Sequence, residues 1–204
     1  MKGDIVKLAV ILAILFLFIG GCTKVQDKKP SLKISGVQEL LLNEQDLEQL
    51  EMSGDFDNKD LEQLGIVFNG TPCKTEEYPT DESSSLLQYS ICSYVIDRLN
   101  DTGVILEFKK FTNLHDLNGS YQYESSHLRS SEGLISENDY GDQSRFYVNN
   151  ENDYGAEFNP PGIYYYTLYF SKDDYLIHVT SKGSSEEAKD SIAKIGRKIL
   201  SKFE

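Results

Sequence analysis

Hydrophobic and polar residues alternate most regularly in the middle of the chain. Residues 87–99 (LQYSICSYVIDRL) and 104–111 (VILEFKKF) are rich in the β-branched and aromatic side chains that favour strands. Asn100-Asp101-Thr102-Gly103 between them has the residue types of a turn, so we expect a β-hairpin. The first strand should then present two faces, one with Leu87, Tyr89, Ile91, Ser93 and Val95, the other with Ser90, Cys92, Tyr94 and Ile96.

Three later segments are also predicted as strands, namely 144–149, 163–171 and 175–181, with a turn at 172–174 joining the last two. Two earlier apolar runs, 37–42 (VQELLL) and 64–68 (LGIVF), are short enough to be strands as well. Between them, residues 55–60 are polar and turn-like. Residues 71–85 hold two prolines and many polar side chains, which indicates a loop that Cys73 would fasten.

Helical periodicity marks three other segments. Residues 44–50 follow Asn43, a good N-cap, and carry acidic residues in their first turn. Residues 112–129 space their apolar side chains like a helix, although Gly119 weakens it. At the C-terminus, Ser184-Ser185-Glu186-Glu187 reads as a capping box. An apolar stripe follows it, made by Ala188, Ile192, Ile195, Ile199 and Phe203.

Strand pairs interrupted by amphipathic helices predict an α+β fold. We expect one antiparallel sheet of about five to six strands with helices packed on one face. A short repeat, Glu137-Asn138-Asp139-Tyr140-Gly141, recurs at 151–155 and brackets the predicted strand 144–149. Two turns around one strand would explain it, because Asp and Gly suit turn geometry. A paired acidic calcium site is the alternative, but neither copy has the ligand order of an EF-hand loop.

Composition narrows the function classes without naming one. The chain has 204 residues, 39% hydrophobic and 26% charged, which suits one globular domain. Its formal charge is −13, and the first 21 residues carry a net +1, so the remainder is strongly acidic. We therefore expect no nucleic-acid partner, because phosphate binding needs a basic face. The same charge argues against the domain body lying on an anionic membrane surface.

The first 22 residues have a pattern of their own, which predicts a targeting signal. Two lysines precede an unbroken apolar run at 8–19 (LAVILAILFLFI), which is short for a membrane span and right for a signal-peptide core. Ile19-Gly20-Gly21-Cys22 follows it. This tetrapeptide resembles the lipobox of prokaryotic lipoproteins. The resemblance covers about the first 22 residues and implies lipid on the thiol of Cys22 and cleavage before it. An uncleaved N-terminal membrane helix remains the alternative.

This assigns 1–21 as a signal peptide, and the composition of the next segment suggests a tether. Residues 22–35 contain four lysines, one aspartate and a proline, with no apolar period, which is typical of a flexible linker. Its lysines would either approach anionic headgroups or sit on a plain solvated spacer. A single extracytoplasmic domain is then expected at 36–204, held at the cell surface by the lipid on Cys22.

The remaining cysteines agree with export. Cys73 and Cys92 are an even pair, and outside the cytoplasm two such thiols usually join. The closed loop would stabilise the fold by roughly 3 kcal/mol. No His or Cys companions stand at metal-ligand spacing near them, so a disulfide is favoured and no metal or cofactor is expected.

Catalytic motifs are missing from the sequence. There is no Gly-x-Ser-x-Gly elbow, phosphate loop or dinucleotide fingerprint. His178 lies opposite in phase to Ile177 and Val179 and is interpreted as a surface histidine rather than a base, because no partner motif accompanies it. His115 and His127 stand twelve residues apart on the predicted helix, which does not suit a shared metal.

The cluster Tyr164-Tyr165-Tyr166 with Tyr169 is the one unusual surface candidate. Alternation places Tyr165 and Tyr169 on one side of their strand, where they could stack on a sugar or a protein. Tyrosine is also simply a good strand former. We therefore expect a non-catalytic binding or interaction module with a protein, small-ligand or envelope partner. An extracytoplasmic hydrolase-like enzyme and an accessory subunit of a membrane complex are the alternatives.

Overall fold

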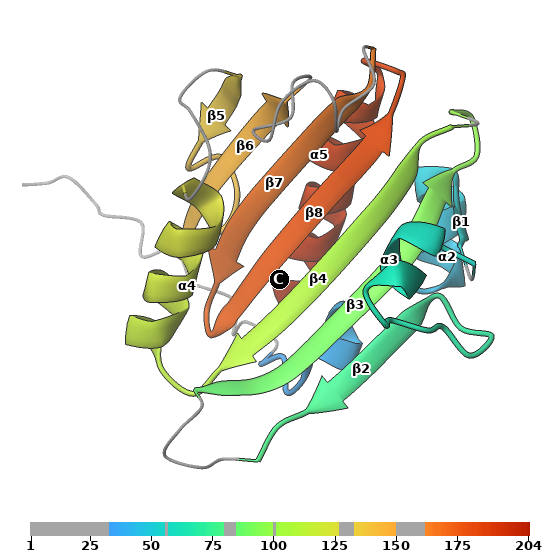
Figure 1. Ribbon diagram of the computed structural model, residues 1–204. Helices are drawn as coiled ribbons and strands as arrows, with labels where there is room; N and C mark the ends of the chain where they lie inside the picture. The colour runs from blue at the N-terminus through green and yellow to red at the C-terminus, as the bar shows by residue number, and fades with distance from the viewer. Residues whose placement is uncertain (1–32, 56, 80–84, 100, 127–132, 150–161) are drawn as a thin grey trace, which may run out of the picture. The chain divides into compact units, whose positions relative to one another are not determined.

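The computed structural model describes residues 33–55, 57–79, 85–99, 101–126, 133–149 and 162–204 (Figure 1). The helical elements are η1 (Val37–Leu40), α2 (Glu44–Leu50), α3 (Lys59–Gln63), α4 (Leu114–Ser126), α5 (Ala188–Leu200) and η2 (Ser201–Phe203). The strands are β1 (Met52–Gly54), β2 (Cys73–Glu77), β3 (Leu86–Ile96), β4 (Gly103–Phe111), β5 (Leu134–Glu137), β6 (Gln143–Asn149), β7 (Tyr164–Lys172) and β8 (Tyr175–Gly183).

All eight strands form one antiparallel sheet in the order β1-β3-β4-β8-β7-β6-β5, and β2 also pairs with β3. The predicted hairpin is confirmed as β3 and β4, and the three later strands are confirmed as β6, β7 and β8. The sheet is larger than the expected five to six strands. The strands that the sequence did not reveal are three short ones, β1, β2 and β5. They are held by pairing with a longer neighbour, so they need no apolar alternation of their own.

The two faces of this sheet are covered differently. We call the side that packs against α5 the back face; its residues include Cys92, Leu106, Phe108, Leu168, Phe170, Ile177 and Val179. On the opposite, front face, α3 packs near one edge and α4 near the other, as Figure 1 shows. The expectation that helices pack on one face only is therefore wrong. The reason is that β3, β4, β7 and β8 carry apolar residues on both faces, and the front ones need cover too.

Helix α5 covers the middle of the back face. Its predicted stripe is confirmed, since Ile192, Ile195 and Ile199 are fully buried. Burying one such side chain stabilises the fold by about 1.5–3 kcal/mol. Gly196 lets the helix approach the sheet, because a Cβ there would lie 2.5 Å from Cδ2 of Leu168. The helix and the sheet are thus in direct contact at this position.

A buried carboxylate fixes α2 beside the end of α5. Asn43 and Asp46 form a reciprocal capping box at the start of α2. Lys198 Nζ and Lys202 Nζ lie 2.9 and 2.7 Å from the two Asp46 oxygens. Burial would raise the pKa of Asp46, but the hydrogen bonds from Lys202 and Lys198 outweigh it and hold this pKa below its usual value.

Three details differ from the sequence expectations. The run at 37–42 is not a strand: Val37 and Leu40 are buried three residues apart, which suits the 3₁₀ helix η1. The run at 64–68 is not a strand either, because Gly65 adopts a left-handed conformation and Ile66 N donates back to the Leu61 carbonyl. The polar stretch before it contains the start of α3, which Asn58 caps.

The prediction of a capping box at the start of the C-terminal helix is also wrong. Helix α5 begins at Ala188, and its N-cap Glu187 receives no side-chain cap. Ser184, just after β8, instead donates through its amide and its hydroxyl to Asp101, just before the neighbouring strand β4. Of the repeated pentapeptide, the first copy is a turn with Asn138 and Gly141 at positive φ. The second copy lies outside the described residues.

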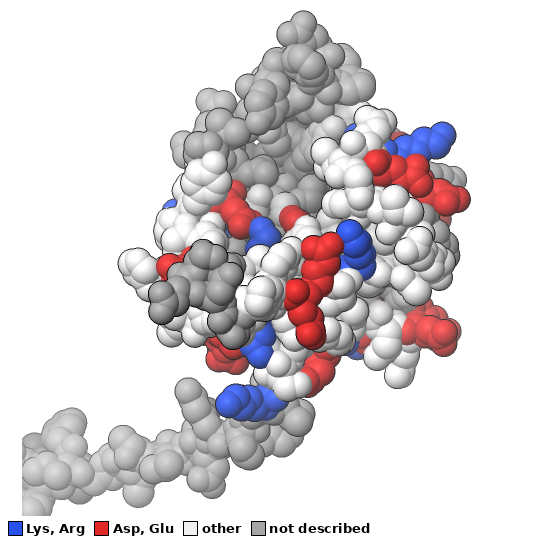
Figure 2. Space-filling view, turned by 60° about the horizontal axis from the view of Figure 1, so that its bottom comes forward, with Lys and Arg blue, Asp and Glu red and all other residues white. Residues whose placement is uncertain are grey.

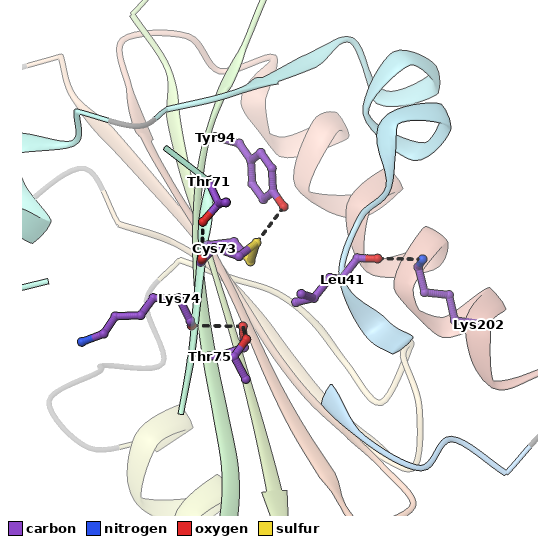
Figure 3. The surroundings of a disulfide bond; sticks show 9 residues. Leu41, Thr71, Cys73, Lys74, Thr75, Tyr94 and Lys202 are labelled. Carbon is purple, nitrogen blue, oxygen red and sulfur yellow. Dashed lines mark hydrogen bonds between the residues drawn. A yellow bond between two sulfur atoms is a disulfide. The ribbon is translucent and has the colours of Figure 1, made fainter. Parts of the chain in front are cut away.

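The disulfide between Cys73 and Cys92 is present, with sulfurs 2.04 Å apart (Figure 3). Both residues face each other across the β2–β3 pair, so residues 73–77 of the expected loop are a strand. Tyr94 lies two residues further along β3, and its hydroxyl is 3.2 Å from Cys73 Sγ. The crosslink therefore joins the short edge strand β2 to the back core rather than closing an irregular loop.

Candidate functional site

A row of polar and aromatic side chains crosses the front face, and α4 packs against the part of it formed by Arg145 and Tyr169. The strand register places Glu137 opposite Arg145, Arg145 opposite Tyr169, Tyr169 opposite His178, and His178 opposite Glu107. One residue from each of five adjacent strands thus lines up across the sheet. We call this the polar row, and its centre is the pair His178 and Glu107.

Close contacts link this pair to a third residue, Thr180. Glu107 Oε2 lies 2.6 Å from His178 Nδ1, and Thr180 Oγ1 lies 2.5 Å from His178 Nε2. Both imidazole nitrogens therefore have a partner. Thr180 follows His178 by two residues, so both side chains leave β8 on the front face.

Glu107 is held in its ionised form. Burial by itself would raise its pKa, but the hydrogen bond and the charge of His178 and the charge of Lys109 outweigh that effect and lower the pKa to about 2. An ionised carboxylate only accepts hydrogen bonds, so His178 Nδ1 must donate to it. In the neutral imidazole Nε2 is then an acceptor, and the Thr180 hydroxyl donates to Nε2.

Two aromatic residues hold this cluster in place. Tyr89 from β3 donates its hydroxyl to Glu107 Oε1 at 2.6 Å. Burial, followed by the charge of Glu107, raises the pKa of Tyr89, so its hydroxyl remains a donor. The Tyr169 ring stacks on the His178 ring, with centroids 4.1 Å apart and planes 10° apart. Glu107 and His178 are accordingly well covered, with side chains 21% and 16% exposed.

Next to this cluster the front face is hollowed into a pocket of about 570 Å³. We call it the front pocket. It lies where β4, β7 and β8 pass beside the segment that carries α3, and its wall includes Thr180. Ile105, Ile163 and Tyr165 make its lining partly apolar. A concave, partly apolar surface with a few polar groups is typical of a small-molecule site.

Charged side chains also line the front pocket. Four of them are acidic, Asp55, Asp57, Asp60 and Asp101, and two are basic, Lys59 and Lys182. Lys182 Nζ lies 2.7 Å from Asp60 Oδ2, and both side chains are more than half exposed. Such a pair contributes under about 1 kcal/mol and can exchange its partner for a ligand.

The helix beside the pocket is tied to the sheet. Asn58 accepts hydrogen bonds from the first turn of α3 through Oδ1. Its Nδ2 donates to Ser93 Oγ at 2.8 Å, and Ser93 is fully buried. Leu61 packs against Ile91 in the same cluster. The wall that α3 forms is thus fixed to β3 rather than loosely laid over it.

The predicted tyrosine surface lies at this site, divided between its two parts. Tyr165 lines the front pocket, while Tyr169 is a buried member of the polar row and the stacking partner of His178. Tyr164 and Tyr166 stack on each other, with ring centroids 6.2 Å apart. Tyr166 lies in the back core. The alternation predicted for this strand is confirmed.

The interpretation of His178 as a surface histidine is wrong. Its phase along the strand is as expected, but its side chain is mostly buried and bonded to Glu107 and Thr180. Both partners escaped detection, because Glu107 lies on another strand and Thr180 carries no motif. The detectable signal was polar alternation on two strands, Glu107 with Lys109 and Thr180 with Lys182, opposite apolar residues.

The other candidates lie elsewhere. His115 lies near the start of α4 and is not a member of the polar row. His127 and Cys22 lie outside the described residues. Within the described ranges no three His, Cys, Asp or Glu side chains converge as a metal site. In the same part of the chain no helix is long and apolar enough to span a bilayer.

Figure 2 shows one side of the surface, where acidic groups are spread out and basic groups lie among them. Several pairs bind directly, for example Lys172 with Asp142 at 3.0 Å and Arg145 with Glu137 at 2.9 Å. On this side, the acidic groups of the described residues are thus distributed rather than gathered in a single patch.

No family model matches the chain, and no curated protein matches it. Among solved structures, the chain resembles the extracellular domain of PknH from Mycobacterium tuberculosis, at 12% identity and a TM-score of 0.40. The match covers 79% of this chain and 93% of that one. At this score the likeness assigns neither a family nor a function.

Proposed function

We propose that the protein is a membrane-anchored extracytoplasmic lipoprotein whose folded domain binds a small ligand in the front pocket. The observation that carries the binding role is the pocket itself, about 570 Å³ with a partly apolar lining. The lipobox-like Ile19-Gly20-Gly21-Cys22 supports the anchor. The disulfide supports export, because such bonds persist in oxidising compartments.

A rigid frame around the pocket supports the binding role. The strands that form its floor continue into the back core, where Leu106 and Val179 are fully buried. Asn58 and Ser93 hold its α3 wall. A preformed site loses little entropy on binding, so it can hold a ligand with few polar contacts.

Methyl NMR of the full chain in detergent tests this proposal directly. Isoleucine δ-methyls of Ile105 and Ile163 report on the pocket, and those of Ile192 and Ile195 under α5 are internal controls. The probes are a defined set of monosaccharides, amino-acid amides and short-chain carboxylic esters. Shifts confined to the pocket methyls support the site. Shifts in the control methyls alone would contradict the proposed site. The absence of any methyl shift with every probe would contradict it as well.

The anchor has a separate test. Cys22→Ser should release the protein from the membrane fraction and change its gel mobility, because the thiol that accepts lipid is gone. Cys73→Ala with Cys92→Ala is the matched control, since it removes the other two cysteines and keeps Cys22. Unchanged membrane retention of Cys22→Ser would refute the lipid anchor and leave the pocket proposal untouched.

A further inference from the structure

The front pocket is lined by a threonine whose hydroxyl is already hydrogen-bonded to a base. Thr180 lines the pocket and also contacts His178 Nε2 at 2.5 Å. His178 in turn contacts Glu107 at 2.6 Å through its other nitrogen. A hydroxyl, an imidazole and a carboxylate in this order are the parts of nucleophilic catalysis, in which the base activates the hydroxyl and the third group orients the base.

We propose that Thr180 is the nucleophile of an esterase site in the front pocket, with His178 as its general base and Glu107 as the positioning residue. This rests on the proposed function only for the pocket, and it goes beyond binding by assigning a reaction. The substrate class is a carboxylic ester whose apolar part lies against Ile105, Ile163 and Tyr165.

The hydrogen-bond directions suit this role. Because the ionised Glu107 fixes the proton on His178 Nδ1, the lone pair of Nε2 faces the Thr180 hydroxyl. The stacked Tyr169 ring and the hydroxyl of Tyr89 keep the imidazole and the carboxylate from turning away. The base is therefore preorganised before any substrate binds.

The reaction balances in two steps. In the first, Thr180 Oγ1 bonds to the ester carbonyl carbon, its proton moves to His178 Nε2, and the carbon–alkoxy bond breaks as the alcohol leaves with that proton. In the second, water gives a proton to Nε2 and attacks the acyl carbon, the bond to Oγ1 breaks, and Oγ1 regains the proton. One ester and one water yield one acid and one alcohol.

The pocket also offers positive charge for the carbonyl oxygen. Lys182 lies two residues beyond Thr180 on the same face of β8 and lines the same pocket. Its ammonium is paired with the exposed Asp60, an interaction weak enough to give way to a developing oxyanion.

The first test is acyl transfer from p-nitrophenyl acetate to the full chain purified in detergent. Peptide mass spectrometry after acid quench should find one acetyl group on Thr180. Thr180→Val and His178→Gln should lose that acetylation and lower p-nitrophenol release on the order of 100-fold. Thr180→Ser should keep both signals. Thr167→Val is the matched control, because it makes the same substitution at the residue paired with Thr180 across β7 and β8. This variant should leave both signals intact.

Glu107→Gln tests the positioning role. Gln can donate to His178 Nδ1, which would move the ring proton to Nε2 and take the acceptor away from Thr180. In the wild type the acetylation should vary with pH. In the variant the acetylation should be low at every pH, with a flattened profile. A merely structural Glu107 would lower stability and leave the profile of the folded fraction unchanged.

The outcomes separate this proposal from the one before it. p-Nitroacetanilide, the amide analogue, reports binding through the methyls of Ile105 and Ile163. Pocket shifts without Thr180 acetylation in the wild type would overturn the esterase and keep the binding module. Acetylation confined to lysines, or equal in Thr180→Val, would also overturn the esterase. Thr180 acetylation without pocket shifts would support the esterase while contradicting stable ligand binding.

Discussion

The two faces of the sheet are built from the same strands but differ in packing and in polarity. On the back face Leu106, Phe108 and Phe170 are fully buried beneath α5 and its neighbours. On the front face of those strands, Glu107 binds His178 and lies beside a pocket. Because successive strand residues alternate sides, one face can be fully packed for stability while the other carries polar groups. The comparison predicts that substitutions on the two faces have separable effects.

Phe170→Ala should have the largest effect. Phe170 is fully buried and its ring lies 6.2 Å from that of Tyr140, so the variant leaves a cavity and should lower the free energy of unfolding by about 3–5 kcal/mol. Thr180→Val on the front of the next strand should lower it by only about 1 kcal/mol. Urea unfolding followed by circular dichroism measures both. Equal losses would erase the distinction between the faces.

Removing the disulfide should rank second. Cys73→Ala with Cys92→Ala opens a crosslink between residues 19 apart and should lower the free energy of unfolding by about 3 kcal/mol. Dithiothreitol should produce a similar loss in the wild type and none in the double variant. The pocket methyls of Ile105 and Ile163 should keep their chemical shifts, because the crosslink lies in the back core. Altered pocket shifts would show that the faces are coupled.

The front face should contribute stability that depends on pH. The folded pKa of Glu107, about 2, lies below its ordinary value of 4.5, so its contribution is full above about pH 4.5 and disappears as the pH falls towards 2. Its size should be about 2 kcal/mol after allowance for partial exposure of the side chain. Glu107→Gln should remove this dependence, measured as the urea midpoint against pH. Asp46, in α2 beside the end of α5, also has a lowered pKa. The urea midpoint of Asp46→Asn against pH therefore gives the corresponding measurement on the other side of the sheet. An unchanged slope in Glu107→Gln would contradict the assigned contacts.

Lys182→Met should have the smallest effect on stability. It removes an exposed ion pair with Asp60 and should change the free energy of unfolding by less than about 0.5 kcal/mol. It should still shift the methyl signals of Ile105 and Ile163, because all three residues line the front pocket. A large change in the melting temperature would mean that the pocket wall depends on this pair.

The sequence correctly predicted the elements that are determined by the residue pattern within a single segment. The β3–β4 hairpin, the strands β6 to β8 and the apolar stripe of α5 follow from alternation and helical spacing within single segments. Strand β2 could not be predicted this way, because CKTEE has no apolar alternation and exists as a strand only through its pairing with β3. The same limit applies to the site. His178 and Glu107 stand 71 residues apart, and only the β4–β8 register brings them together.

The edges of the sheet have a consequence for how the molecules behave when crowded. Strands β1 and β2 have three and five residues and both pair with β3, while β5 at the opposite edge has four. On β2, Lys74 and Glu76 form an ion pair at 2.8 Å. Short, charged edge strands give a neighbouring chain little backbone to add to. Copies held at high local density, as a lipid tether would hold them, are thereby protected from edge-to-edge aggregation.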